Sequence, residues 1–240
     1  IFISPTGQLL SGWEGCVSWC NKTSQDPVQT ANAYAATIHK YDQFRKGDLI
    51  DGMPKMKQTF AEVFLDKLFY LDFYSIERFG KTKLGQMLLY AKQSQNRELI
   101  RQLIDEVVPQ IAAVVKRYSI DGIVFIPPTV KREVQFMKEL EKRAYLAVRS
   151  LAVGKIKTDI IVPQKTLTKL EDRVENARLT IVIEDIGRYN NILLVDDAVG
   201  SGATLNETAK QIKKRGLCEG EIIGLAITGS FKGFDVISEV

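Results

Sequence analysis

The chain has 240 residues, of which 45% are hydrophobic, so it can bury one substantial core or a main domain with a smaller appendage. Its 33 basic and 29 acidic residues give a net charge of +4, which would tolerate an anionic ligand but does not indicate nucleic-acid binding. No apolar run approaches the roughly 20 residues that span a bilayer, and no signal sequence is evident. The sequence therefore predicts a cytoplasmic protein without a membrane span.

The N-terminal segment is the least patterned part of the chain. Residues 1–30 carry Gly, Ser, Pro, Asn and Gln and are expected to form a loosely ordered lead-in. Cys16 and Cys20 have the spacing of half a zinc site, which only Cys218 and His39 could complete. These four residues are scattered along the chain, so structural thiols and a surface histidine are the favoured interpretation. No bound zinc is expected.

The middle of the chain predicts a strand followed by helices. Residues 60–80 are aromatic-rich and could form a strand, and residues 83–92 could form the helix after it. Residues 97–118 place apolar side chains at helical spacing, with Pro109 as the expected kink or break.

From Asp121 onward, predicted strands alternate with predicted helices. Short apolar runs predict strands at residues 122–128, 158–163, 179–185, 191–196 and 221–230. Amphipathic patterns predict helices at residues 131–152 and 204–216, the second closed by Gly216 at the C′ position. This alternation is typical of a parallel α/β sheet, in which ligands bind beyond the carboxyl ends of the strands.

Residues 191–208 combine the features of a phosphate site. An apolar strand runs into Asp196 and Asp197, a glycine-rich turn follows, and Thr204 opens the next helix. Free backbone amides, the helix N-terminus and hydroxyls can hold a phosphate, and two carboxylates beside it suit sugar hydroxyls or a hydrated Mg²⁺. The alternative is a tight turn with a solvated aspartate pair at its mouth. The order of strand, aspartate pair, turn and helix favours the phosphate site.

Two better-known phosphate loops do not fit this stretch. A Walker A loop has a lysine immediately before its Ser or Thr, where this chain has Ala203. A dinucleotide-binding loop has its acidic residue about 20 positions after the glycines, not ahead of them.

The sequence ILLVDDAVGSGATL, residues 192–205, resembles the phosphoribosyl-pyrophosphate signature of type I phosphoribosyltransferases. The resemblance implies that Asp196 and Asp197 are catalytic and hold the ribose hydroxyls. It implies that the loop around the 5-phosphate consists of Ala198, Val199, Gly200, Ser201, Gly202, Ala203 and Thr204. Gly200 and Ser201 stand where the family usually has two threonines, so one hydroxyl is missing while the loop amides remain.

Further segments after about residue 70 are similar to the ComF branch, the competence-associated phosphoribosyltransferase-like proteins. The matching positions are the lysine of a helix, Lys92, and a Gln-Thr, Arg and Asn pattern at Gln164, Thr166, Arg173 and Asn176. Taken alone, these residues leave plainer interpretations open. Lys92 could be a solvated lysine, and Arg173 and Asn176 could be a surface pair on a helix.

The segment expected near pyrophosphate departs from the branch, which usually has Arg-Gly-Phe-Asn-Gln here. Lys131 and Arg132 preserve the charge, but Val134 and Gln135 replace the Arg-Gly pair. Lys131, Arg132 and Arg173 are the candidates to meet the leaving group.

A polar segment that contains Lys165 and Lys169 lies where type I enzymes have a lysine-bearing loop over the site. The alternative is an ordinary loop.

The resemblance implies a type I phosphoribosyltransferase-like fold, a parallel sheet flanked by helices, with a smaller N-terminal region. The expected divisions are a lead-in at residues 1–30, as the remnant of the branch's zinc module, a hood-like region at residues 31–95, and the α/β domain at residues 96–240.

The resemblance also implies a reaction. Phosphoribosyl pyrophosphate, bound with Mg²⁺, would lose pyrophosphate to a nitrogen nucleophile through an oxocarbenium-like state. The alternative is a non-catalytic module that binds the same ligand in DNA uptake or regulation, with single-stranded DNA or the competence machinery as partners. A homodimer is compatible with both, and the acceptor cannot be read from the sequence.

Overall fold

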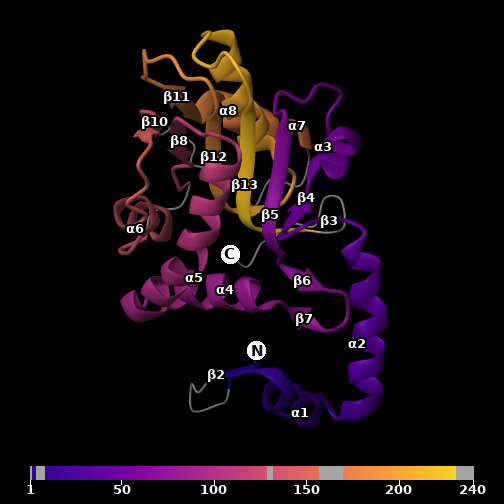
Figure 1. Ribbon diagram of the computed structural model, residues 1–240. Helices are drawn as coiled ribbons and strands as arrows, with labels where there is room; N and C mark the ends of the chain where they lie inside the picture. The colour runs from indigo at the N-terminus through magenta and orange to yellow at the C-terminus, as the bar shows by residue number, and fades with distance from the viewer. Residues whose placement is uncertain (1, 4–8, 129–131, 157–169, 231–240) are drawn as a thin grey trace.

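The computed structural model describes residues 2–3, 9–128, 132–156 and 170–230. Within these residues, the centre of the molecule is a seven-stranded sheet of order β3-β4-β5-β13-β12-β8-β9 (Figure 1). Its strands are β3 (Arg45–Lys46), β4 (Leu49–Asp51), β5 (Lys67–Phe73), β8 (Gly122–Phe125), β9 (Arg149–Ser150), β12 (Ile192–Val199) and β13 (Ile222–Gly229). The five strands from β5 to β9 in this order are parallel, whereas β3 and β4 are antiparallel to their neighbours. The expected α/β class with a mostly parallel sheet is confirmed.

The other described strands form three antiparallel pairs outside this sheet. They are β1 (Phe2–Ile3) with β2 (Leu9–Leu10), β6 (Ser75–Ile76) with β7 (Gly80–Lys81), and β10 (Val153–Lys155) with β11 (Ile181–Ile183). The strand predicted at residues 179–185 is therefore β11, and it pairs with β10 rather than with the parallel strands.

Helices flank the sheet on both faces, as expected. The described helices are α1 (Gly12–Thr23), α2 (Pro27–Asp42), α3 (Met53–Thr59), α4 (Lys83–Ser94), α5 (Arg97–Arg117), α6 (Phe136–Arg143), α7 (Leu170–Thr180) and α8 (Ala203–Lys214). Among the described residues, no helix is both long enough and apolar enough to cross a membrane.

Alternation along the strands divides the interior into two cores. Leu193 and Val195 of β12 point to the core that α4, α5 and α6 cover, whereas Ile192 and Leu194 point to the core that α3 and α8 cover. Because β12 is buried on both faces, its sequence is continuously apolar up to Asp196, and this is why the strand could be predicted.

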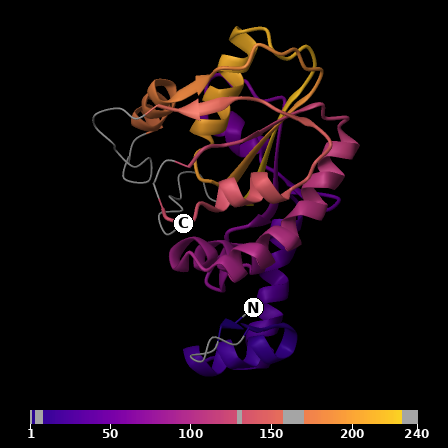
Figure 2. The ribbon, with the colours of Figure 1, turned by 90° about the vertical axis from the view of Figure 1, so that its left-hand side faces the viewer.

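The N-terminal helices form a hairpin at one end of the molecule. α1 and the first part of α2 lie at the foot of both views, away from the sheet (Figures 1 and 2). The expectation of a loosely ordered lead-in is wrong for residues 12–23, which form α1. Local signals start α2: Pro27 is its first residue, and the carboxylate of Asp26 accepts a hydrogen bond of 2.7 Å from the Gln29 amide.

Two predicted helices differ from their expected form. Pro109 does not break α5, and it lies on the exposed side of the helix. The buried side of α5 packs into the core both before and after Pro109, which keeps the helix continuous. The helix predicted at residues 131–152 is shorter than expected: α6 ends at Arg143, and Tyr145 adopts a left-handed φ of 42° before the chain enters β9. The strand predicted at residues 158–163 lies outside the described residues.

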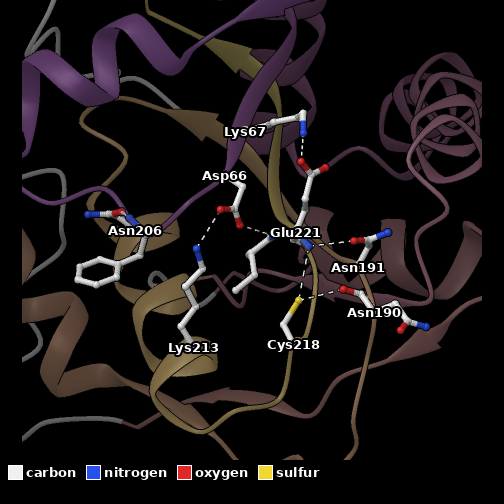
Figure 3. A network of polar contacts seen from close by, with 10 residues as sticks. Asp66, Lys67, Asn190, Asn191, Asn206, Lys213, Cys218 and Glu221 are labelled. Atoms are coloured by element: carbon white, nitrogen blue, oxygen red, sulfur yellow. Dashed lines mark hydrogen bonds and ion pairs between the residues drawn. The ribbon is translucent and has the colours of Figure 1, made fainter.

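A polar network holds the amino ends of β5, β12 and β13 together (Figure 3). The carboxylate of Asp66 accepts hydrogen bonds from the Ile222 amide at 2.8 Å and from Lys213 at 3.0 Å. The side-chain oxygen of Asn191 accepts the Glu221 amide at 2.9 Å. These contacts fix the edge of the sheet opposite the one that carries Asp196 and Asp197.

Candidate functional site

Asp196 and Asp197 lie near the carboxyl end of β12, the edge predicted for ligands. β12 continues past both residues to Val199, so the aspartates belong to the strand rather than to the loop after it. Asp196 is in register with Ala226 of β13, which keeps this part of the strand hydrogen-bonded within the sheet. The two side chains therefore project from a rigid element.

Lys92 reaches Asp197 from helix α4. The Lys92 Nζ atom lies 2.5 Å from Asp197 Oδ2, and only 11% and 18% of the two side chains are exposed. The two residues are joined by the packing of α4 onto the sheet and are far apart in the sequence. The alternative of a solvated Lys92 is wrong, because the lysine is largely buried in its ion pair with Asp197.

Lys155, which the sequence analysis missed, belongs to the same cluster. It is the last residue of β10, and its charge interacts with those of Asp196 and Asp197. Burial lowers the pKa of Lys155, while the two carboxylates act to raise it. Lys155 is brought to the site by the pairing of β10 with β11, in which it opposes Ile181. The sequence could have pointed to Lys155 only if this pairing had been recognised.

Asp196 is the most perturbed group of the cluster. Burial, followed by the negative charge of Asp197, raises the pKa of Asp196 to about 7. Lys155, the Asp197 amide at 2.9 Å from Asp196 Oδ1, and Lys92 act in the opposite direction. Two carboxylates and two ammonium groups thus share a small, partly desolvated volume, which is a frequent property of functional sites.

The glycine-rich turn connects this cluster to helix α8. Gly202 has a φ of 86° and is the N-cap, so α8 begins at Ala203 and Thr204 lies in its first turn. The Ser201 Oγ atom accepts a hydrogen bond of 3.3 Å from the Ala203 amide, which leaves its hydroxyl proton able to donate. The turn has the predicted form of strand, loop and helix N-terminus.

The loop is partly covered by its surroundings. Val199, Ser201, Gly202 and Ala203 are buried, whereas Ala198, Gly200 and Thr204 are partly exposed. Helix α3 covers the turn, and a Cβ atom at Gly202 would lie 2.4 Å from the Sδ atom of Met56. An anion could therefore approach this loop at its partly exposed positions.

Helix α7 carries Arg173 and Asn176 and packs against α8. Arg173 is only 4% exposed, and burial lowers its pKa. A surface pair is therefore the wrong interpretation of Arg173. Asn176 is partly buried, and its backbone carbonyl accepts the Thr180 hydroxyl at 2.6 Å.

The segment that departs from the ComF pattern packs against the end of α4. The Val134 amide donates a 3.1 Å hydrogen bond to the side chain of Gln95, and Val134 is buried. Arg132 is partly exposed and follows β8, whose carboxyl end adjoins β12. The remaining predicted positions, Lys131, Gln164, Lys165, Thr166 and Lys169, lie outside the described residues.

The cysteines and the histidine do not come together. Cys16 and Cys20 are one turn apart on α1, and burial, followed by the neighbouring Cys20, raises the pKa of the Cys16 thiol. Cys218 lies at the amino edge of the sheet, 3.3 Å from the Asn190 carbonyl, and His39 is exposed on α2. Among the described residues, no three His, Cys, Asp or Glu side chains form a metal-binding group.

A scan against models of protein families and a search of curated proteins found no match to this chain.

Proposed function

We propose that the protein is a type I phosphoribosyltransferase-like protein of the ComF branch. In this proposal it binds phosphoribosyl pyrophosphate with Mg²⁺ and transfers the phosphoribosyl group to a nitrogen acceptor. The signature at residues 192–205 suggests the substrate class, and the segment ends at the carboxyl edge of a mostly parallel sheet, the edge where such sheets generally bind ligands.

One observation carries the proposal. Asp197 is paired with Lys92 and interacts with Lys155, directly ahead of a glycine turn that opens helix α8. A solvated aspartate pair that only closes a turn would have no need of two partly desolvated lysines from separate elements. Carboxylates for sugar hydroxyls, ammonium groups for phosphate oxygens and a partly exposed helix N-terminus together match a phosphorylated sugar.

Each group has a role in the proposed reaction. Asp196 and Asp197 orient the ribose hydroxyls and partly balance the positive charge of the oxocarbenium-like state. The partly exposed positions of the loop, Gly200 and Thr204, contact the 5-phosphate. Lys155, which the structure places beside the aspartates, joins Arg132 as a candidate to meet the leaving pyrophosphate.

The residues present also fit Mg²⁺. This ion is usually held by one or two carboxylates together with substrate phosphates and water, and Asp196 and Asp197 offer such carboxylates beside the loop. When bound, Mg²⁺ would supply charge neutralisation on the leaving group.

The proposal is tested by giving the protein phosphoribosyl pyrophosphate and Mg²⁺ with a mixed panel of nitrogen bases, and measuring pyrophosphate release. We expect release that depends on one base of the panel. Binding of phosphoribosyl pyrophosphate without release by any base would favour the non-catalytic alternative.

Replacing both aspartates with asparagine tests the binding role directly. Hydrogen bonds to charged groups contribute roughly 1.5–3 kcal/mol each, so Asp196→Asn with Asp197→Asn should weaken phosphoribosyl pyrophosphate at least about tenfold in calorimetry with Mg²⁺. Thr204→Val is the matched control: it removes one hydroxyl while the loop amides remain, and it should have a smaller effect. Unchanged affinity in the double variant would show that the carboxylates serve only the turn.

The non-catalytic alternative rests on the segment around Val134. This segment is packed against α4 through the Gln95 hydrogen bond, and it lacks the Arg-Gly pair that the branch usually has. A module of this kind would keep the sugar-phosphate site and act in DNA uptake or regulation.

A further inference from the structure

Two thiols of helix α1 contact each other across one helical turn. Cys16 and Cys20 are four residues apart, the spacing that places two side chains on the same side of a helix. Both are free thiols, and their side chains are hydrogen-bonded to each other. The proposed transfer reaction assigns no role to this pair.

The geometry of a helix does not suit a disulfide bond at this spacing. Side chains one turn apart have Cβ atoms about 5–6 Å apart, whereas a disulfide needs a Cβ separation of about 3.5–4.5 Å. Oxidation of the pair would therefore have to distort α1 at this turn. A metal ion between the two sulfurs requires no such distortion, because it lengthens the bridge between the two Cβ atoms.

A cavity gives access to one of the two thiols. It has a volume of about 470 Å³ and lies between the N-terminal helices and the end of β5, where Asp72 lines it. Its walls come from α1, α2 and the β6–β7 hairpin, in the lower half of Figure 1, and Cys16 and Trp19 belong to the α1 wall. Cys20, in contrast, is fully buried. An ion that enters the cavity would therefore reach Cys16 first, and its second ligand would be shielded from water.

Two thiols are too few for zinc but sufficient for a soft monovalent ion. Structural Zn²⁺ is held by four ligands, and among the described residues no third His, Cys, Asp or Glu side chain joins this pair. Cu⁺ prefers thiolate ligands and forms stable complexes with two of them, one on either side of the ion. The type and number of ligands at Cys16 and Cys20 therefore favour Cu⁺ over Zn²⁺.

We propose that Cys16 and Cys20 form a two-coordinate site for Cu⁺. On binding, both thiols release their protons to solvent and two Cu–S bonds form, so the complex carries one negative charge. No electron is transferred, because copper enters the site and stays there in the monovalent state. The proposal does not rest on the transferase function, since it involves no residue of the proposed sugar-phosphate site.

The tryptophans of the chain give this helix its own spectroscopic signal. The chain has two, and both Trp13 and Trp19 lie on α1, with Trp19 directly before Cys20. Quenching of tryptophan fluorescence by a bound ion therefore reports on α1 rather than on Asp196 and Asp197.

The test titrates the reduced full chain with Cu⁺ under anaerobic conditions, in competition with bicinchoninate, a coloured chelator of Cu⁺. We expect one equivalent of Cu⁺ to move from the chelator to the protein, with quenching of the tryptophan fluorescence. Cys16→Ser should weaken Cu⁺ binding at least about a hundredfold, because only one thiolate of the pair remains. Cys218→Ser is the matched control: it also removes one thiol, at the amino edge of the sheet, and should change the affinity less than about threefold.

Thermal unfolding separates the loss of a ligand from damage to the fold. Cys16 is partly exposed, so Cys16→Ser should unfold at the wild-type temperature without Cu⁺. One equivalent of Cu⁺ should raise the unfolding temperature of the wild type but not that of the variant. No transfer of Cu⁺ from the chelator, an equal loss in the two serine variants, or binding of Zn²⁺ as tight as that of Cu⁺ would overturn the proposal.

Discussion

Two carboxylates and two ammonium groups share the carboxyl end of β12, and their charges do not simply cancel. Burial raises the pKa of Asp196 and lowers that of Lys155, so both groups are shifted toward their neutral forms. The pair of Asp197 and Lys92, in contrast, makes a direct contact. An ionised Asp196 therefore lowers the stability of the folded state. Such a cost is common at residues that bind a ligand.

Asp196→Asn should stabilise the protein in a pH-dependent way. The native pKa of about 7 exceeds the ordinary 3.8, so between these values the folded state binds more protons than the unfolded state. The free energy of unfolding therefore falls as pH rises from about 4 to 7. Asp196→Asn does not lose stability in this way, so its unfolding temperature should exceed that of the wild type at pH 8. The difference in unfolding temperature should shrink toward pH 4, and calorimetric scans measure it.

Asp121→Asn is the matched control, with the opposite sign. Burial alone would raise the pKa of Asp121, but hydrogen bonds from the Asn190 and Asn191 amides outweigh it and lower the pKa. The Asp121 carboxylate therefore contributes stability that is present above its ordinary pKa and lost as pH falls through the lowered value. This variant should unfold at a lower temperature than the wild type at pH 8. A lowered unfolding temperature for Asp196→Asn at pH 8 would contradict the prediction.

Lys92→Met should destabilise the fold, because it removes the direct ion pair of the partly buried Asp197 and leaves Lys155 as the neighbouring positive charge. Loss of one member of a buried pair typically costs about 3 kcal/mol. Adding Asp197→Asn removes the charge that has lost its direct partner, so the double variant should be more stable than Lys92→Met alone. Urea unfolding measures both differences. A change below about 0.5 kcal/mol in Lys92→Met, as at an ordinary surface position, would show that the contact has no energetic role.

The junction of β12 with α8 depends on one glycine for two separate reasons. Gly202 has a positive φ, which other residues adopt at a cost, and it lies against Met56 of α3, which is fully buried. The first reason concerns the turn alone, whereas the second ties the turn to a neighbouring helix.

Gly202→Ala separates these reasons when it is compared with Gly216→Ala. Gly216, after α8, has a φ of 64°, and a Cβ atom there would have no atom of the described residues within 4 Å. Its replacement should therefore cost only about 1 kcal/mol of conformational strain. Gly202→Ala adds the clash with Met56 and should cost clearly more, with weaker phosphoribosyl pyrophosphate binding. Urea unfolding and calorimetry measure the two effects, and equal losses at both glycines would contradict a role for the α3 contact.

The elements that could be predicted from the sequence are those whose burial leaves a clear pattern. β8, β12 and β13 are buried on both faces and appear as apolar runs, and α5 and α8 show helical spacing. β11 was predicted from the apolar run at residues 179–185, but its pairing with β10 could not be, since the three residues of β10 leave no periodicity and the pairing is not local. Lys155 was missed for this reason.

In the molecule as a whole, the sequence predicted the sheet and the position of the aspartate pair at its carboxyl edge, but not which other segments lie beside that edge. The aspartate pair and the glycine turn are contiguous in the chain, so their proximity is a local property. The contact of Lys92 with Asp197 and the cavity at Asp72 join segments that only the fold brings together. The α1–α2 hairpin was also missed, because the mixed composition of residues 1–30 concealed its helices.

The position of β13 has a consequence for how the chain reaches this structure during synthesis. β13 lies between β5 and β12, and Lys67 at the start of β5 is in register with Ile223. The middle of the sheet, and with it the edge that carries Asp196 and Asp197, can close only after almost all of the described chain has left the ribosome. Such distant pairing folds slowly and leaves β5 and β12 as unpaired edges in the nascent chain, where chaperones and premature strand pairing would compete for them.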